Sequence, residues 1–404
     1  MKVLSWIASL FFMLFYLGSC ITEIEPEDIG FDDLLVVEAL ITDKAVKHVV
    51  KLSRTVPINA SGVRPESNAV VRVESTDQGT IAFFEEEPGI YRSSLPIAGK
   101  FDTQYKLLIT TADGNEYESS EVEMVATPAI DAITAEFVPE PLDTIGPALK
   151  YLGDFNFYLD SKNNQNKTKS LRYLWTETYK IRVPNPSRWK WLGGNSFEFR
   201  NEDIPEEQEE FCYRYDSSRT IIVNKSLTSS GEVLRYPIHS FDARTRQMNI
   251  RYSLEVVQYG LSVESEKYWT GLATGAQSQG SLFDIQPGTI TGNIKPLSDP
   301  NETVLGIFEV AQEGRKRVFF RASDFYSQGF GPSSLTWIDC EDIEQEEVAL
   351  ASIGEFMSAN NEKYELLYFT TSFAPSGGPA IFGIKRCALC TLYGTNKKPA
   401  FWID

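Results

Sequence analysis

The chain has 404 residues, which is long enough for two domains, each with its own hydrophobic core. It carries 56 acidic against 38 basic side chains and a formal charge of −18, so nucleic acid and anionic lipid headgroups are not expected as partners. Only two histidines occur, His48 and His239, which argues against a histidine-rich metal site and against a histidine-dependent catalytic triad.

Residues 1–19 have the composition of a secretory signal peptide. A basic start at Lys2 precedes an almost unbroken apolar run over 3–17, which is shorter than the roughly 20 residues that a helix needs to span a bilayer. The run ends in LGSC at 17–20, which resembles the bacterial lipobox, where the chain is cut before the cysteine and the thiol is acylated. We therefore predict a lipoprotein signal peptide over 1–19 and a lipid anchor on Cys20. The alternative is an ordinary signal peptide with an incidental cysteine.

Residues 20–33 are predicted to form an acidic tether. Six of them are Asp or Glu, and too few are apolar to pack, so the segment should be solvated. In Bacteroidetes lipoproteins, acidic residues directly behind the lipidated cysteine resemble the signal for export to the cell surface. This pattern favours an outer-membrane, lipid-anchored protein that faces the cell surface.

The chain has five cysteines, and their number bears on which disulfides can form. If lipid takes Cys20, then Cys212, Cys340, Cys387 and Cys390 remain, and an even number is what two disulfides require in an oxidising compartment. We expect structural disulfides, with Cys340 joined to one member of the Cys387-x-x-Cys390 motif. The alternatives are a redox-active CxxC and a zinc site to which Cys212 and Cys340 supply the missing ligands. Zinc is disfavoured because exported zinc–thiolate sites are uncommon.

From residue 34 the sequence has the pattern of short β-strands. Runs rich in branched and aromatic residues are separated by turn signals at close spacing. About seven strands are expected, and they begin near residues 34, 48, 69, 81, 90, 105 and 115. This spacing is typical of an Ig-like β-sandwich, which we place at 34–127, and nothing in this unit suggests catalysis.

The remainder, 128–404, is predicted to be a larger β-rich domain with one or two short helices, so the fold class is mainly β. Residues 149–159 and 170–183 have the pattern of two strands paired around a polar loop. Further strands are expected at 248–258, 304–310, 317–321 and 364–369.

Two helices are expected in this larger domain. The first follows Ser262, a suitable N-cap, and carries Tyr268 and Trp269 at helical spacing, where core packing is the expected role. The second and weaker one covers 344–358. The domain closes with the CxxC motif and the sequence KPAFW at 398–402, whose aromatic residues we expect to dock on the domain.

Two acidic stretches, 201–210 and 341–347, raise the question of calcium. Neither has the alternating D-x-D-x-D pattern with its glycine, so we expect solvated loops and no metal site. The glycine-rich stretch 279–294 does not precede a helix as a phosphate-binding loop does, so we expect no nucleotide and no other cofactor.

Several of these stretches together resemble one family. They are the lipobox, LVVEALITD at 35–43, the helix with Tyr268-Trp269 that leads to GSLFD at 280–284, the stretch 287–293, and the CxxC motif that ends in KPAFW. In these features the whole mature chain is similar to the DUF4249 family of Bacteroidetes outer-membrane lipoproteins. The family often has glycine where Ala39 stands and an acidic residue where Ala400 stands. Since it has no assigned function, the resemblance implies no catalytic residues.

Members of this family are often encoded beside TonB-dependent outer-membrane receptors, so the resemblance implies such a receptor as a partner. We therefore expect a non-enzymatic surface lipoprotein that binds a small molecule, glycan or peptide and cooperates with a TonB-dependent transporter in nutrient uptake. It would contact the membrane through its lipid anchor only. One alternative is a glycan hydrolase that uses two carboxylates, although no motif singles out the pair. The other is an adhesin or structural protein of the envelope.

Overall fold

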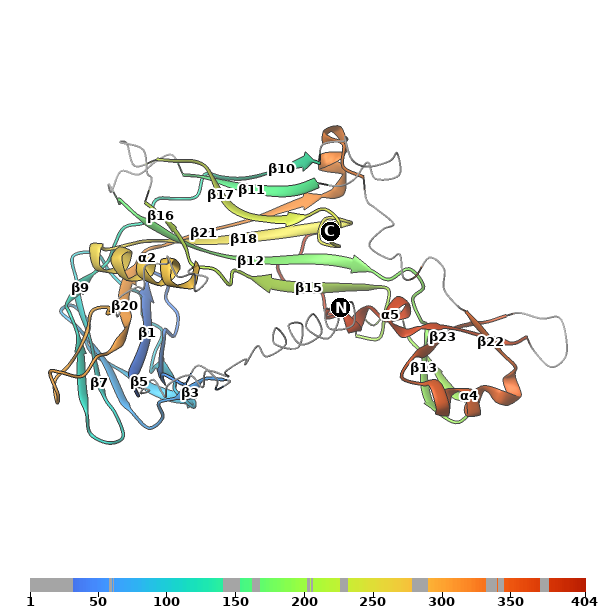
Figure 1. Cartoon of the computed structure of the whole chain (residues 1–404), viewed down its shortest axis with the longest axis horizontal. Helices are drawn as coiled ribbons and strands as arrows, with labels where there is room; N and C mark the ends of the chain where they lie inside the picture. The colour runs from blue at the N-terminus through green and yellow to red at the C-terminus, as the bar shows by residue number, and fades with distance from the viewer. Residues whose placement is uncertain are drawn as a thin grey trace, which may run out of the picture.

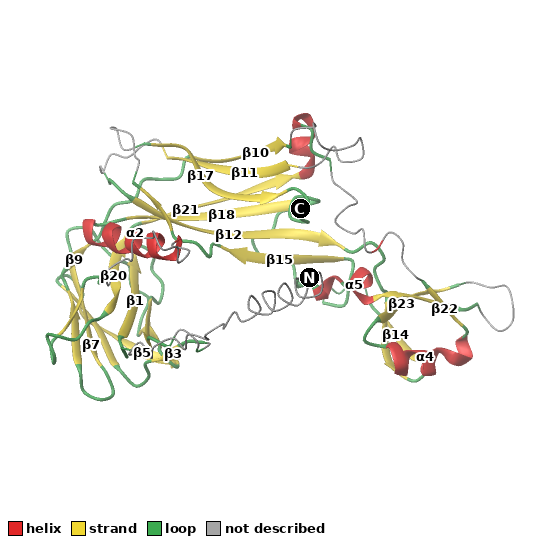
Figure 2. Cartoon of the chain, in the orientation of Figure 1, coloured by secondary structure: helices red, strands yellow, loops and turns green. Residues whose placement is uncertain are grey.

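The computed structural model describes residues 32–57, 60, 62–140, 153–161, 168–201, 204, 206–225, 232–277, 290–331, 340, 345–370 and 378–404. The fold is mainly β, as predicted, with several sheets and a few short helices (Figure 2). Three units follow one another along the long axis in Figure 1: an N-terminal sandwich at the left, a central sandwich, and a small distal lobe at the right. No helix within the described ranges has the length and apolarity to span a bilayer. The predicted signal peptide, Cys20 and residues 21–31 of the tether lie outside those ranges.

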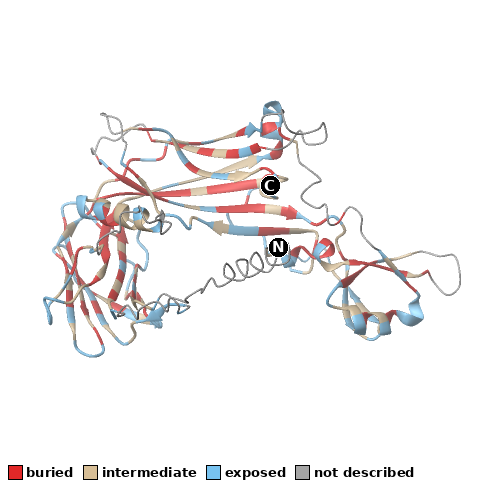
Figure 3. Ribbon diagram, viewed as in Figure 1, coloured by how far each residue is buried: buried red, intermediate tan, exposed pale blue. Residues whose placement is uncertain are grey.

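The N-terminal sandwich is built from one curled sheet with the strand order β19-β8-β7-β4-β5-β6-β2-β1-β20. Its inward side chains alternate with exposed ones, as in β4, and they form a single apolar core (Figure 3). All seven strands predicted between residues 34 and 119 are present. The strands are β1 (Leu35–Thr42), β2 (Val49–Arg54), β3 (Arg64–Pro65), β4 (Val70–Ser75), β5 (Gly79–Glu87), β6 (Ile90–Ser93), β7 (Gln104–Thr110), β8 (Glu116–Ser119), β9 (Val122–Glu123), β19 (Ile294–Pro296) and β20 (Leu305–Ala311).

Two strands of this sheet come from much later in the chain. β20 pairs in parallel with β1, and β19 pairs antiparallel with β8. On its other side, β20 meets the segment that follows β9, where the Val125 N–H donates to the Val310 carbonyl at 3.0 Å. The N-terminal unit therefore extends beyond the predicted range 34–127, because alternation along a strand identifies its buried face but not its partner.

Gly306 allows β20 to approach β1 closely. Its φ is +113°, and a Cβ at this position would lie 1.9 Å from the Val37 carbonyl oxygen. We expect Gly306→Ala to lower the free energy of unfolding by about 2 kcal/mol or more, since it adds a backbone clash to an unfavourable φ. Urea unfolding would measure this. Gly79→Ala is the matched control, because Gly79 also has a positive φ, +70°, but a Cβ added there would have nothing within 4 Å. Equal losses in the two variants would contradict the close approach.

The central sandwich has two facing sheets that enclose the largest apolar core. One sheet contains β10 (Ala132–Pro139), β11 (Gly153–Ser161) and β17 (Val233–Asp242). The other contains β12 (Leu171–Arg182), β15 (Phe211–Ser217), β16 (Ile222–Asn224), β18 (Arg251–Gly260) and β21 (Glu313–Arg321). The short helix η3 (Ala322–Gln328) packs against this core through Phe325. Helix α2 (Val263–Gln277) follows β18, and its predicted cap is confirmed, since the Ser265 N–H donates to the Ser262 hydroxyl at 3.1 Å.

The predicted pairing of 149–159 with 170–183 is wrong. β11 pairs with β10 and β17, whereas β12 pairs with β15, β16 and β18, so the two strands belong to opposite sheets. They still share a core, to which β11 contributes Phe157 and β12 contributes Tyr173. Nearness in sequence predicts a hairpin, but here the connection crosses from one sheet to the other. Residues 162–167 of that connection lie outside the described residues.

The distal lobe combines a hairpin with a three-stranded sheet and a helix around a small core that includes Met357, Leu366 and Phe382. Its elements are β13 (Trp189–Gly193), β14 (Ser196–Phe199), β22 (Glu346–Val348), η5 (Leu350–Ser352), α4 (Ile353–Asn360), β23 (Tyr364–Phe369) and β24 (Ala380–Ile384). The helix predicted at 344–358 is therefore wrong over 346–348, which form a strand, and its helical part begins only near residue 350.

The chain then returns to the central sandwich through α5 (Lys385–Ala388) and η6 (Cys390–Leu392). Trp402 is buried and packs edge-on against Tyr213 and Phe319. Phe401 lies under the guanidinium of Arg317, with 3.6 Å between its ring centroid and Cζ. The predicted docking of the C-terminal aromatic residues is thus confirmed.

Candidate functional site

A cavity of about 480 Å³ is formed by residues of the central sandwich, of the segments before and after the hairpin in the distal lobe, and of the C-terminal segment. We call it the basic cleft because four cations line it, Lys180, Arg188, Arg200 and Lys398. The remaining lining comprises two carboxylates, two aromatic rings and four other residues, namely Glu209, Glu210, Phe211, Tyr213, Pro186, Ser187, Gln208 and Asn396. Its volume is within the range of small-molecule binding sites, roughly 300–1,000 Å³.

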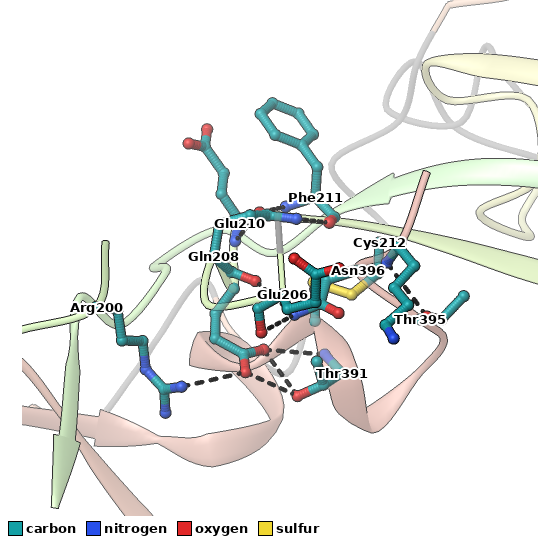
Figure 4. The surroundings of a disulfide bond; sticks show 12 residues. Arg200, Glu206, Gln208, Glu210, Phe211, Cys212, Thr391, Thr395 and Asn396 are labelled. Carbon is teal, nitrogen blue, oxygen red and sulfur yellow. Dashed lines mark hydrogen bonds and ion pairs between the residues drawn. A yellow bond between two sulfur atoms is a disulfide. The ribbon is translucent and has the colours of Figure 1, made fainter. Parts of the chain in front are cut away.

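Segments far apart in sequence meet at this cleft, and the C-terminal segment holds them in place. The backbone N–H of Ser187 donates to the Ala388 carbonyl at 3.0 Å. Tyr213 on β15 and Thr395 exchange two backbone hydrogen bonds of 2.7 and 2.9 Å, as in a short strand pair. The Asn396 amide donates to carbonyls in the loop before β15 at 2.8 and 3.1 Å (Figure 4). The lining residues are therefore fixed on a shared scaffold.

Two disulfides secure that scaffold. Cys212 on β15 bonds to Cys390 (Figure 4). Cys340 bonds to Cys387. All four cysteines are buried. Structural disulfides are confirmed, as is the joining of Cys340 to one member of the CxxC motif. The two cysteines of that motif do not bond to each other, because each bonds to a distant cysteine. No cluster of three or more His, Cys, Asp or Glu suited to a metal occurs within the described residues.

The prediction that the acidic stretch 201–210 is a solvated loop is wrong at Glu209. The Glu209 side chain is buried, and its carboxylate accepts hydrogen bonds from the Thr391 backbone N–H at 3.1 Å and the Thr391 hydroxyl at 2.8 Å (Figure 4). Arg200 lies 3.5 Å from Glu209 and 3.6 Å from Glu365, so it stands between two buried carboxylates. Burial raises the pKa of Glu365. Glu209 thus holds the loop to the C-terminal segment.

The lysines of the basic cleft share one carboxylate. Lys180 lies 3.5 Å from the Oδ1 atom of Asp404, and Lys398 donates a hydrogen bond to the same side chain. That hydrogen bond from Lys398 lowers the pKa of the Asp404 carboxyl, and the charge of Lys180 lowers it further. The ammonium of Lys180 also stands 4.6 Å from the ring centroid of Phe211. Glu210, by contrast, accepts a hydrogen bond from Arg182 at 2.7 Å.

A second polar group lies between the two sandwiches, and we call it the Arg172 cluster. Arg172 of β12 lies 3.2 Å from Glu309 of β20, and the Trp269 indole N–H donates to the same carboxylate at 3.0 Å. The guanidinium stands 4.1 Å from the centroid of the Trp269 ring. Arg172 and Glu309 are 8% and 6% exposed, so this ion pair is buried. Tyr268 is buried as predicted. Trp269 contacts Glu309 of the N-terminal sandwich and Arg172 of the central sandwich, and so joins α2 to both.

Neither histidine lines the basic cleft. The ring of His239 lies inside the central sandwich, with Nε2 3.0 Å from the Glu177 carboxylate. Tyr252 and Gln247 donate to the same carboxylate at 2.7 and 3.0 Å. The ring of His48 lies against the carbonyl of Ile97 at 3.0 Å. Both histidines are therefore parts of the packed fold.

Comparison with known families identifies the chain. The family model described as a domain of unknown function, DUF4249, matches residues 21–317. The chain belongs to the DUF4249 family. The match covers the N-terminal sandwich and most of the central sandwich, together with the hairpin β13–β14 of the distal lobe.

Other comparisons add little to this DUF4249 protein. No curated protein matches its sequence. A crystal structure of a mutant Salmonella alpha-2-macroglobulin is similar at 11% identity, over 72% of this chain and 14% of that one, with a TM-score of 0.17. This chain thus spans a small part of that protein's length, and a similarity this weak supports no inference about fold or function.

Sequence reasoning did not find the cations of the DUF4249 protein's cleft. Lys398 is about 200 residues from Lys180 and Arg200, and the three carry no spacing that marks a site. The one signal is indirect, since Lys398 opens the KPAFW sequence that is predicted to dock. The cysteines are a better guide, because Cys212, which bonds to Cys390, stands between the lining residues Phe211 and Tyr213.

Proposed function

We propose that this DUF4249 protein is a non-enzymatic, lipid-anchored protein of the outer-membrane surface that binds a ligand in the basic cleft and partners a TonB-dependent transporter in nutrient uptake. The observation that carries the proposal is the cleft, a preformed cavity of ligand size on a scaffold that two disulfides hold. The lipobox with Cys20 and the acidic segment behind it support the location.

The carboxylates around the cleft favour binding over glycoside hydrolysis. Hydrolysis needs two carboxyl groups that face the substrate, one of them with a raised pKa. Glu365 has a raised pKa, but it is buried and is not a lining residue of the cleft. Glu209 is held by Thr391, and Glu210 is paired with Arg182. Within the described residues, the carboxylates of this cleft therefore have structural partners already.

The anchor can be tested directly. We expect Cys20→Ala to abolish labelling with palmitate and to release the protein from membranes, because the acyl chains on this residue supply about 0.8 kcal/mol for each buried CH₂ group. Metabolic labelling and membrane fractionation would measure both effects. Lys100→Gln, a substitution on the N-terminal sandwich, should leave labelling and location unchanged. Acylation that persists in the Cys20 variant would contradict the anchor.

The transporter partnership calls for a separate experiment. The tagged protein would be extracted from its own outer membrane in mild detergent and purified, and the retained proteins identified by mass spectrometry. We expect a TonB-dependent receptor among them. Recovery of the lipoprotein alone, from membranes in which such a receptor is present, would refute the partnership.

A further inference from the structure

We propose that the basic cleft selects small organic anions with two or more carboxylates, and that Asp404 holds Lys180 and Lys398 until such a ligand displaces it. This inference rests on the proposed function, because it assumes that the cleft is the ligand site, and it adds the chemical class of the ligand. Acidic sugars and acidic peptides share this chemistry.

The first argument is the charge of the cleft. The chain as a whole carries a formal charge of −18, yet four cations line the cleft against two carboxylates. Those two carboxylates already have partners, since Glu209 accepts a hydrogen bond from Thr391 and Glu210 accepts one from Arg182. The cleft is therefore a cluster of cations in an otherwise acidic protein, in which Arg200 is balanced by Glu209 and Glu365 and the two lysines share the single carboxylate of Asp404. When Asp404 is displaced, the two lysines present a local positive field that attracts anions.

The second argument is that a carboxylate already bridges two of these cations. Lys180 and Lys398 both contact Asp404, which shows that one carboxylate reaches both ammonium groups. The Asp404 side chain is 58% exposed, whereas that of Lys180 is only 21% exposed. Because the carboxylate of Asp404 is largely exposed to solvent, its ion pairs with the two lysines contribute little to stability, so a ligand can replace Asp404 at low cost. A second carboxylate on the ligand adds contacts that Asp404 does not make.

The third argument concerns the rest of the ligand. Phe211 lies beneath Lys180, with 4.6 Å between the ammonium and the ring centroid, and Tyr213 lines the same cleft. Aromatic faces next to cations accept the carbon skeleton of a ligand while the cations hold its charged groups. The cleft thus fits an organic anion better than a bare inorganic ion.

The test is isothermal titration of the full-length protein in detergent with trigalacturonate and with triglutamate, and with uncharged galactotriose for comparison. We expect at least one of the two anions to bind and galactotriose not to bind. Because each lysine contributes a charge-assisted contact, Lys180→Gln and Lys398→Gln should each weaken binding by about tenfold. Lys100→Gln is the matched control, since Lys100 pairs with Asp77 on the N-terminal sandwich and should leave binding unchanged.

Asp404→Asn is expected to raise the affinity for the anion, which a misfolded variant would not do. It frees both lysines and removes a competing charge, so affinity for the anion should rise severalfold, and added salt should weaken binding in every variant. Failure of both anions to bind, equal binding of galactotriose, or no change in the lysine variants would overturn the ligand class. If the protein nevertheless retains a TonB-dependent receptor, the proposed function stands and only the ligand class is wrong.

Discussion

Replacing Glu309 with alanine is expected to lower the free energy of unfolding by about 3–5 kcal/mol, because it leaves the buried guanidinium of Arg172 without its carboxylate. The indole N–H of Trp269 loses its acceptor at the same time. Chemical denaturation monitored by tryptophan fluorescence would measure the change. The first transition should involve the contact between the N-terminal and central sandwiches, since the Arg172 cluster joins them.

Two further variants make this result specific. Replacing both charged residues, Arg172→Met with Glu309→Leu, should restore much of the lost stability, because no uncompensated charge stays buried. Glu38→Ala is the control, since Glu38 and Lys51 line a cavity together with Arg172 and Glu309 and form an ion pair 3.5 Å long, but are 62% and 59% exposed. Its loss should cost less than about 1 kcal/mol. Similar losses for Glu38→Ala and Glu309→Ala would contradict a buried pair.

Removing the Cys212–Cys390 disulfide is the second change with a large expected effect. The double variant Cys212→Ala, Cys390→Ala should lose about 2–5 kcal/mol of stability, since the bond closes a long loop with a sequence separation of 178 residues. It should also weaken binding at the basic cleft, because Cys390 anchors the segment that carries Asn396 and Lys398. Urea unfolding and titration with trigalacturonate or triglutamate would measure the two effects.

Reductant supplies the control for this prediction. Reduction should destabilise the wild-type protein more than the double variant, which retains only the Cys340–Cys387 bond. Hydrogen exchange should show the largest loss of protection at Tyr213 and Thr395, whose paired backbone hydrogen bonds lie beside the removed bond. An unchanged unfolding midpoint in the double variant would show that the hydrogen bonds of the C-terminal segment suffice without the disulfide.

The sequence allowed the strands of the N-terminal sandwich to be predicted because their burial alternates with a period of two, as in β4. It did not reveal that β20 pairs with β1, since that pairing joins residues about 270 positions apart. The same limitation made β11 and β12 appear as a hairpin. Local patterns predict elements, whereas contacts between distant segments decide which elements meet.

At the candidate site, too, the sequence alone left most contacts between distant segments unpredicted. The cysteine count predicted two disulfides, and we also expected Cys340 to bond to one cysteine of the CxxC motif. The sequence did not indicate that this partner is Cys387 rather than Cys390. The acidic composition of 201–210 predicted a solvated loop, although the burial of Glu209 depends on Thr391, which is 182 positions away. In the sequence, nothing distinguishes the four cations of the basic cleft from ordinary surface residues, and only the fold brings them together.

The most direct test compares what the wild-type protein and a cleft variant retain from their own cells. Tagged wild-type protein and the double variant Lys180→Gln, Lys398→Gln would be purified from native outer membranes, and bound small molecules identified by mass spectrometry. We expect the wild type to retain a compound with two or more carboxylates and the variant to lose it, while both retain the same receptor. An identical set of small molecules on both proteins would contradict ligand binding in the basic cleft.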